Sequence, residues 1–108
     1  MKTYEKIYNL VKKIPKGQVS TYGQIGQLLN INPRVVGSAL NRLAKYQSKS
    51  NGIPWQRVIN SKGGISTNRL MNIPLGLQKK LLEREGIRFN KDEKTDLSKY
   101  LWGKKQKI

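Results

Sequence analysis

The chain has 108 residues, with 22 Lys and Arg against 6 Asp and Glu, a formal net charge of +16, and neither Cys nor His. This length is typical of one domain, so we expect a single domain over residues 1–108. Because Cys and His are absent, disulfides, thiolate and imidazole catalysis and Cys-type zinc sites are excluded. Residues 6–82 contain no acid, so they cannot supply a carboxylate pair or an oxygen-ligand metal cage. We therefore expect no cofactor.

Two short helices are predicted within the first thirty residues. The first has Thr3 as its N-cap and stops at Pro15. Its apolar residues recur at helical spacing: Tyr4, Ile7, Tyr8, Val11 and Ile14. The second begins at Ser20–Thr21, where Gln24 follows Thr21 by three residues, as in a capping box. Its apolar positions are Ile25, Leu28 and Leu29.

A third helix is predicted from Pro33 to about Ala44, with Asn32 as its N-cap. At about 100° per residue, its apolar face carries Val36, Ala39, Leu40 and Leu43. The opposite face, which we call the polar stripe, carries Arg34, Gly37, Ser38, Asn41 and Lys45. Two helices joined by a four-residue turn, the second with a polar face, indicate a helix-turn-helix. The small residues Gly37 and Ser38 would let a groove wall come close; alternatively, Gly37 relieves crowding against another helix.

The segment after the third helix predicts a small β element. Residues 46–52 form a polar loop. Residues 53–60 are rich in β-branched side chains and are followed by a Gly-containing turn at 61–64 and by Ile65–Ser66. This pattern predicts a short hairpin, which would be the wing of a winged helix. The expected fold class is therefore mostly α with a small β wing, a winged helix-turn-helix.

One more helix and a returning tail are predicted in the last third of the chain. After a loop at 68–74, the helix runs from about Leu75 to Glu85 and ends at Gly86. Its buried residues are Leu77, Leu81 and Leu82. We expect residues 97–102 to fold back on the body and residues 103–108 to form a frayed basic end.

The charges are unevenly distributed, because residues 6–82 hold 13 Lys and Arg and no acid. Such an excess neutralises phosphates and releases counterions, so nucleic acid is the expected partner and a membrane surface is the rival. No apolar run has the length of a membrane span, and Met1–Glu5 lacks the apolar region of a signal peptide. We therefore expect an intracellular monomer that does not bind membranes.

Four segments resemble one family, in order along the chain. They read IPKGQVSTYGQI at 14–25, RVVGSAL at 34–40, PWQRVIN at 54–60 and EREG at 83–86. They resemble the DNA-binding domain of O6-alkylguanine-DNA alkyltransferases, and the similarity extends over residues 4–102. The resemblance implies the winged-helix fold of the C-terminal domain of those enzymes.

The position of the acceptor cysteine in that family is occupied here by Trp55. Alkyltransferases carry Pro-Cys-His-Arg where this chain reads Pro-Trp-Gln-Arg at 54–57. Replacement of the Cys by Trp marks the alkyltransferase-like proteins, which bind alkylated DNA without accepting the alkyl group, and the chain is identified as a member of that group. The chemistry agrees, because dealkylation needs an activated nucleophile and neither an indole nor a carboxamide provides one. We therefore expect no enzymatic activity.

The resemblance also implies roles for single residues in nucleotide flipping, which costs a few kcal/mol. Trp55 would line the lesion pocket, Tyr22 would rotate the 3′ phosphate, and Arg34 would enter the base stack in place of the flipped guanine. The planar cation of Arg34 suits stacking and can donate to the orphaned cytosine. Residue chemistry alone leaves alternatives open: a core tryptophan for Trp55, a helix-packing aromatic for Tyr22 and an ordinary phosphate contact for Arg34.

In the related family the recognition helix lies in the minor groove, which would explain the small residues of the polar stripe. The DNA- and lesion-binding residues expected on this basis are Tyr22, Arg34, Gly37, Ser38, Asn41, Trp55, Arg57 and Arg69. Arg69 is chosen as the only Arg in the loop at 66–76, with Asn68 as a neutral substitute.

The chain departs from the family in two places. Relatives usually have His where this chain has Gln56, so the hydrogen bonds inside the pocket and the role of Glu85 are open. The loop at 66–76 is longer than in close relatives.

We expect a non-enzymatic sensor that binds O6-alkylguanine in double-stranded DNA and signals to nucleotide-excision repair proteins. The alternative is a winged-helix or nucleoid-type protein that binds DNA regardless of lesions, and an active alkyltransferase is the third possibility. A lesion-independent binder would show a steep salt dependence and no lesion preference.

Overall fold

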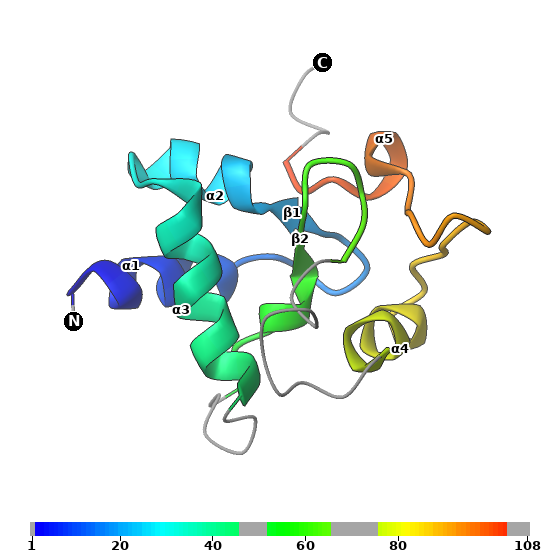
Figure 1. Ribbon diagram of the computed structural model, residues 1–108, viewed down its shortest axis with the longest axis horizontal. Coiled ribbons are helices and arrows are strands. Elements are labelled where there is room, and N and C mark those ends of the chain that lie inside the picture. Colours follow the sequence, from blue (N-terminus) through cyan, green and yellow to red (C-terminus); the bar gives the residue numbers. More distant parts are fainter. Residues whose placement is uncertain (1, 46–51, 66–75, 104–108) are drawn as a thin grey trace.

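A computed structural model describes residues 2–45, 52–65 and 76–103. Helices surround a short two-stranded sheet (Figure 1). In chain order the elements are α1 (Lys2–Val11), β1 (Ser20–Thr21), α2 (Tyr22–Leu29), α3 (Pro33–Lys45), the 3₁₀ turn η2 (Trp55–Arg57), β2 (Val58–Ile59), α4 (Leu77–Arg84) and α5 (Leu97–Tyr100). The expected class, mostly helical with a small sheet, is confirmed.

Helix α1 packs an apolar face against α3 and is fastened there by Tyr8. Ile7 and Val11 are fully buried, and the Tyr8 hydroxyl donates to the Ala39 carbonyl over 3.0 Å. Burial raises the pKa of Tyr8 above its ordinary value of 10.0. The Tyr8 hydroxyl therefore stays protonated as a donor to the backbone of α3 at neutral pH.

Both ends of α1 differ from the prediction. The helix begins at Lys2, so Thr3 lies inside its first turn and the prediction of a Thr3 cap is wrong. A cap contributes only about 1 kcal/mol, so the packed apolar face decides where the helix begins. At the other end α1 stops at Val11, and the Ile14 amide donates to the Val11 carbonyl (3.1 Å) in a tighter turn before Pro15.

The start of α2 is capped as the sequence predicts, although only half of the capping box forms. The Gln24 amide donates to the Thr21 hydroxyl oxygen over 3.0 Å. The Gln24 side chain does not return to Thr21 but accepts from the Ser20 hydroxyl and donates to the Trp102 carbonyl. Gln24 therefore connects the start of α2 to the C-terminal tail.

The turn between α2 and α3 is tight. Asn30 adopts the left-handed conformation (φ 57°), and the Ile31 amide donates to the Gly26 carbonyl over 2.8 Å, which ends α2. A Cβ at Gly26 would lie 2.5 Å from the Ile31 carbonyl oxygen, so this turn requires glycine. Asn32 then caps α3, since its Oδ1 accepts from the Arg34 amide over 2.8 Å.

The predicted apolar face of α3 is buried as expected. Val36, Ala39 and Leu40 are at most 1% exposed. They belong to the main hydrophobic cluster, which also contains residues of α1, α2, η2 and β2. Leu28, which was predicted to be an apolar position of α2, is instead 59% exposed. The helix is short, and Ile25, Gly26 and Leu29 already supply its inward face.

Within the described residues, β2 pairs with β1 instead of forming the predicted hairpin, whose second arm at Ile65–Ser66 is described only at Ile65. The pair is parallel, with Ser20 opposite Val58 and Thr21 opposite Ile59. Within the described residues the segment 61–65 forms a turn without a strand, and η2 replaces the expected strand before Val58. Both strands are fully buried, so their β-branched residues fit an inner parallel pair as well as a wing.

Helix α4 and the tail cover the other side of the strand pair (Figure 1). The helix begins at Leu77, and its end matches the prediction: Gly86 has φ 95° and the Ile87 amide donates to the Leu82 carbonyl. Leu82 and Ile87 join Val19 and Ile59 in a second hydrophobic cluster.

The predicted return of the tail is confirmed. Val19 and Leu101 form a parallel bridge, and the Trp102 amide donates to the Val19 carbonyl over 2.7 Å. The predicted basic end lies outside the described residues except for Gly103, which is part of a turn. Over the described ranges, no helix has the length and apolar character needed to cross a membrane.

Candidate nucleic-acid interface

The outward face of α3 carries the polar stripe predicted from the sequence. Arg34 and Ser38 are exposed, and Gly37 and Asn41 are half-buried. Residue 34 is joined to the fold through its main-chain amide, so the Arg34 guanidinium is presented at the surface at the first turn of α3. The structure thus brings four of the predicted site residues onto one helix face, whereas the Lys45 side chain lies outside the described part.

None of the described residues crowds Gly37. A Cβ added there would meet nothing within 4 Å, and the residue is absent from the glycines with positive φ. The alternative that Gly37 relieves crowding against another helix is therefore wrong. Glycine inside a helix costs about 1 kcal/mol relative to alanine, and no packing contact in the described residues requires it here. The open space beside Gly37 leaves room for a binding partner that approaches α3 from outside.

Asn41 adds an unsatisfied acceptor to the same face. Its Oδ1 is buried and has no hydrogen-bond partner among the described residues, which is unusual for a buried polar atom. Leaving such an acceptor without a donor costs about 1–3 kcal/mol.

Tyr22 is the first residue of α2 and follows β1 directly. It is half-buried and packs against the main hydrophobic cluster. The neighbouring Gly23 is exposed, and a Cβ there would meet only the Thr21 hydroxyl at 3.9 Å. Tyr22 and Arg34 therefore stand at the N-terminal ends of two helices that pack against each other.

Trp55 is the first residue of η2, and its side chain is 4% exposed within the main hydrophobic cluster. The fold thus uses Trp55 as a core residue in the unbound protein. The role as pocket wall, which the resemblance implies, stays a prediction.

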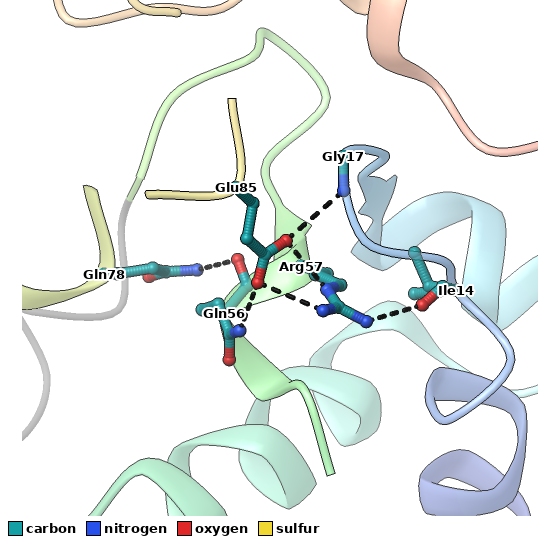
Figure 2. A network of polar contacts seen from close by, with 6 residues as sticks. All are labelled: Ile14, Gly17, Gln56, Arg57, Gln78 and Glu85. Carbon is teal, nitrogen blue, oxygen red and sulfur yellow. Dashed lines mark hydrogen bonds and ion pairs between the residues drawn. The ribbon is translucent and has the colours of Figure 1, made fainter. Parts of the chain in front are cut away.

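Polar contacts connect η2 with α4 and its end through four residues, which we call the polar network: Gln56, Arg57, Gln78 and Glu85. The side chains of Gln56 and Arg57 donate to the Glu85 carboxylate, and the Gln78 side chain donates to the main-chain carbonyl of Gln56. Figure 2 shows the Arg57 guanidinium between the Glu85 carboxylate and the Ile14 carbonyl. Arg57 donates from Nε to Glu85 Oε1 (2.9 Å) and from Nη2 to Oε2 (3.1 Å), while Nη1 donates to the Ile14 carbonyl (2.8 Å). All three nitrogens of the Arg57 guanidinium are thus engaged within the protein.

Glu85 collects two further donors. Gln56 Nε2 donates to Glu85 Oε2 over 2.8 Å, and the Gly17 amide reaches Oε1 over 3.5 Å (Figure 2). Side-chain exposure is 17% for Arg57 and 9% for Glu85, so water screens the pair only partly. The sequence predicted Arg57 as a DNA contact; that role stays untested, and the structure turns the guanidinium inward.

Gln78 is the member of the polar network that the sequence analysis missed. It is 3% exposed, and its Nε2 donates to the main-chain carbonyls of Gln56 (3.1 Å) and Val58 (3.0 Å). Its position four residues before the buried Leu82 was the available signal, because the two share one face of α4.

Two predicted residues cannot be placed. Arg69 and its substitute Asn68 fall within 66–75, outside the described residues. In the three described ranges, no group of His, Cys, Asp or Glu has the number and arrangement needed to hold a metal ion.

Known proteins are similar to this chain in both sequence and fold. The family model for the DNA-binding domain of 6-O-methylguanine DNA methyltransferase matches residues 2–87. A DNA base-flipping protein of Vibrio parahaemolyticus is 41% identical over 99 residues, which span 90% of this chain and 92% of that protein. Alkyltransferase-like protein 1 of Schizosaccharomyces pombe is 37% identical over 105 residues, 92% of this chain and 93% of that protein.

Among solved structures, Atl1 of Schizosaccharomyces pombe in complex with damaged DNA containing O6-carboxymethylguanine matches with a TM-score of 0.79, at 36% identity and over 94% of each chain. Together with the absence of any cysteine from the sequence, these similarities identify the branch as well as the fold. The chain therefore belongs to the family of the 6-O-methylguanine DNA methyltransferase DNA-binding domain, among its alkyltransferase-like members.

Proposed function

We propose that the chain binds O6-alkylguanine in double-stranded DNA with the damaged nucleotide flipped out, and that it transfers no alkyl group. The observation that carries the proposal is the outward face of α3, where Gly37 has open space beside it and Arg34 is exposed. The relatives support it, since one is named a DNA base-flipping protein and another is bound to DNA with an alkylated guanine.

The family resemblance implies roles for Arg34 and Tyr22, and their places at the starts of α3 and α2 support these roles. Flipping leaves a gap in the base stack, and the planar, always charged guanidinium of Arg34 stacks in such a gap and donates to the unpaired cytosine. Tyr22 provides a rigid ring at the start of α2 that turns the phosphate of the flipped nucleotide. Gly37 and Ser38 let α3 lie close to the walls of the minor groove.

Trp55 stands where the related enzymes have their acceptor cysteine, and we propose that it packs against the alkyl group instead of accepting it. An indole has no nucleophile to accept an alkyl group, but its ring packs against an apolar substituent. Because Trp55 is only 4% exposed, contact between its ring and a lesion requires neighbouring side chains to move aside. Binding of an alkylated duplex should therefore change the fluorescence of Trp55.

A protein that holds a lesion without repairing it leaves its removal to other proteins. We propose that the bound complex directs nucleotide-excision repair proteins to the site. The missing acceptor group supports this step, because a protein without a cysteine cannot remove the alkyl group itself.

Paired titrations test the proposal. The protein is titrated against one duplex with a single O6-methylguanine and against the same duplex with guanine, at equal salt. We expect at least about tenfold tighter binding to the damaged duplex, which corresponds to about 1.4 kcal/mol. Equal affinities would refute the proposal. Incubation with DNA that carries a radiolabelled methyl group should leave no label on the protein.

A DNA-binding function without lesion preference is the second candidate, and the net charge of +16 favours it. Such a protein would lose affinity with salt at a slope of about 0.9 per neutralised phosphate, equally for both duplexes. The lesion-specific protein shows the same slope on both duplexes but a constant difference in affinity between them.

A further inference from the structure

We propose that Arg57 and Glu85 are positioning residues for lesion recognition, because they fix the turn that carries Trp55 relative to the segment that leads to Tyr22. The inference rests on the proposed function and gives the polar network a part in it. Neither side chain needs to touch DNA for this role.

Several distant segments of the chain meet at the Glu85 carboxylate. Glu85 lies at the end of α4, Arg57 belongs to η2, and Gly17 belongs to the turn before β1. The bonds to Glu85 span 28 residues from Arg57 and 68 residues from Gly17. Through Arg57 Nη1 the same group also reaches the Ile14 carbonyl. One ion pair therefore links three parts of the chain that are distant in sequence.

Two of these segments lead into the strand pair. The turn at 14–17 leads into β1, and η2 leads directly into β2. Since β1 and β2 are parallel, with Ser20 opposite Val58, both turns enter the pair at the same end. The ion pair between Arg57 and Glu85, which we call the clamp, lies at that end. It fixes the position of one segment relative to the other, which we call their offset. Trp55 opens one of them and Tyr22 follows the other, so this offset contributes to the placement of both residues.

The hydrogen bonds of Arg57 are directional, unlike the packing around Trp55. Trp55 is held mainly by hydrophobic packing, which is not directional and tolerates small shifts. The fork of Arg57 uses both oxygens of Glu85 and a third acceptor, which fixes orientation as well as distance. A lysine at position 57 keeps the charge but has one nitrogen and cannot reproduce the fork. Recognition sites are sensitive to displacements of about 1 Å, so a loosened clamp should affect lesion recognition first.

The test compares two substitutions that change the net charge equally. Glu85→Gln breaks the clamp, and Glu93→Gln removes the acid of the exposed Lys79–Glu93 pair on the surface of α4. For each variant and for Arg57→Lys, the dissociation constant is measured on the duplex with O6-methylguanine and on its unmodified match. We expect Glu85→Gln and Arg57→Lys to lower the ratio of the two constants about tenfold, while Glu93→Gln keeps the wild-type ratio.

A second measurement needs no DNA. In a Trp102→Phe background Trp55 is the only tryptophan, and acrylamide quenching reports its accessibility. We expect the quenching constant to rise about twofold in Glu85→Gln and in Arg57→Lys but not in Glu93→Gln. If Glu85→Gln fails to fold, the comparison of Arg57→Lys with the control decides.

The outcomes separate this inference from the proposed function. A wild-type protein with equal affinity for both duplexes refutes the proposed function and with it the lesion role of the clamp. A wild-type preference that survives in both clamp variants overturns the inference alone, as does a parallel loss of affinity for both duplexes, which indicates a purely structural pair.

Discussion

Two arginines of this chain stand in surroundings of opposite kinds. Arg57, in the polar network, donates hydrogen bonds from all three guanidinium nitrogens, to the Glu85 carboxylate and to the Ile14 carbonyl. Arg34, at the first turn of α3, is exposed and is joined to the fold through its main-chain amide. The fold therefore explains why residue 57 is an arginine, whereas it does not explain residue 34.

Two glycines repeat the contrast. A Cβ at Gly26 would collide with the Ile31 carbonyl oxygen at 2.5 Å, whereas a Cβ at Gly37 would meet nothing within 4 Å. A residue type that the fold requires says little about partners. A residue type that the fold does not require, and that costs stability, points to a partner outside the chain, and for the polar stripe we propose the DNA minor groove.

The largest expected difference is in the stability effects of the two arginines. Arg57→Ala leaves Glu85 partly buried without its cation and should lower the free energy of unfolding by about 3 kcal/mol. Arg34→Ala should change it by less than about 0.5 kcal/mol, because the side chain is exposed. Urea denaturation followed by circular dichroism measures both, and similar losses in the two variants would remove the contrast.

The two glycines should respond to alanine with opposite signs. Gly26→Ala forces the turn between α2 and α3 apart and should destabilise the protein by about 2 kcal/mol. Gly37→Ala should stabilise it by about 0.5–1 kcal/mol, because alanine is the better helix former and the space is open. The stabilised Gly37→Ala protein should nevertheless bind duplex DNA more weakly. An unchanged affinity would show that α3 does not approach DNA at this position.

Arg34→Lys tests whether the guanidinium stacks or merely neutralises a phosphate. If Arg34 stacks in the gap, the lesion preference should fall about tenfold, or about 1.4 kcal/mol, while the salt dependence stays the same because the charge is kept. Arg42→Lys is the matched control, because Arg42 is exposed on the same helix but outside the polar stripe. A preference that survives Arg34→Lys favours the phosphate contact.

A smaller effect is expected on the inward side of α3. Tyr8→Phe removes the hydrogen bond to the Ala39 carbonyl and should lower the free energy of unfolding by about 1 kcal/mol at neutral pH. Because burial raises the pKa of Tyr8 in the folded state, its contribution is fully present below pH 10.0 and is lost as the pH rises through the higher folded value. Alkaline unfolding curves should therefore show a shallower loss of stability in Tyr8→Phe than in the wild type. Lesion preference should not change.

The features that the sequence predicted well depend on neighbouring residues. The caps at Thr21 and Asn32, the glycine that ends α4 and the buried face of α3 all follow from spacings of a few residues. The polar stripe was found in the same way, since it is the other face of the same helical periodicity.

What the sequence could not predict depends on contacts between distant segments. A β-branched stretch indicates a strand but not its pairing partner. We therefore expected β2 in a hairpin, whereas it pairs with β1: Ser20 lies opposite Val58, 38 residues further along the chain. The polar network is likewise invisible, because Glu85 and Gly17 are 68 residues apart. The resemblance to a family named Trp55 and Glu85, but only the structure shows that one lies in the core and the other holds Arg57.

The central claim is that the chain flips an alkylated guanine out of duplex DNA, and the fluorescence of 2-aminopurine tests it directly. The probe is placed next to O6-methylguanine in one duplex and next to guanine in its match, and each is titrated with protein. Loss of stacking next to the flipped base should raise the 2-aminopurine emission severalfold in the damaged duplex. The emission in the matched duplex should stay nearly unchanged. Unchanged emission at saturating protein in the damaged duplex, or an equal rise in both duplexes, would contradict the account.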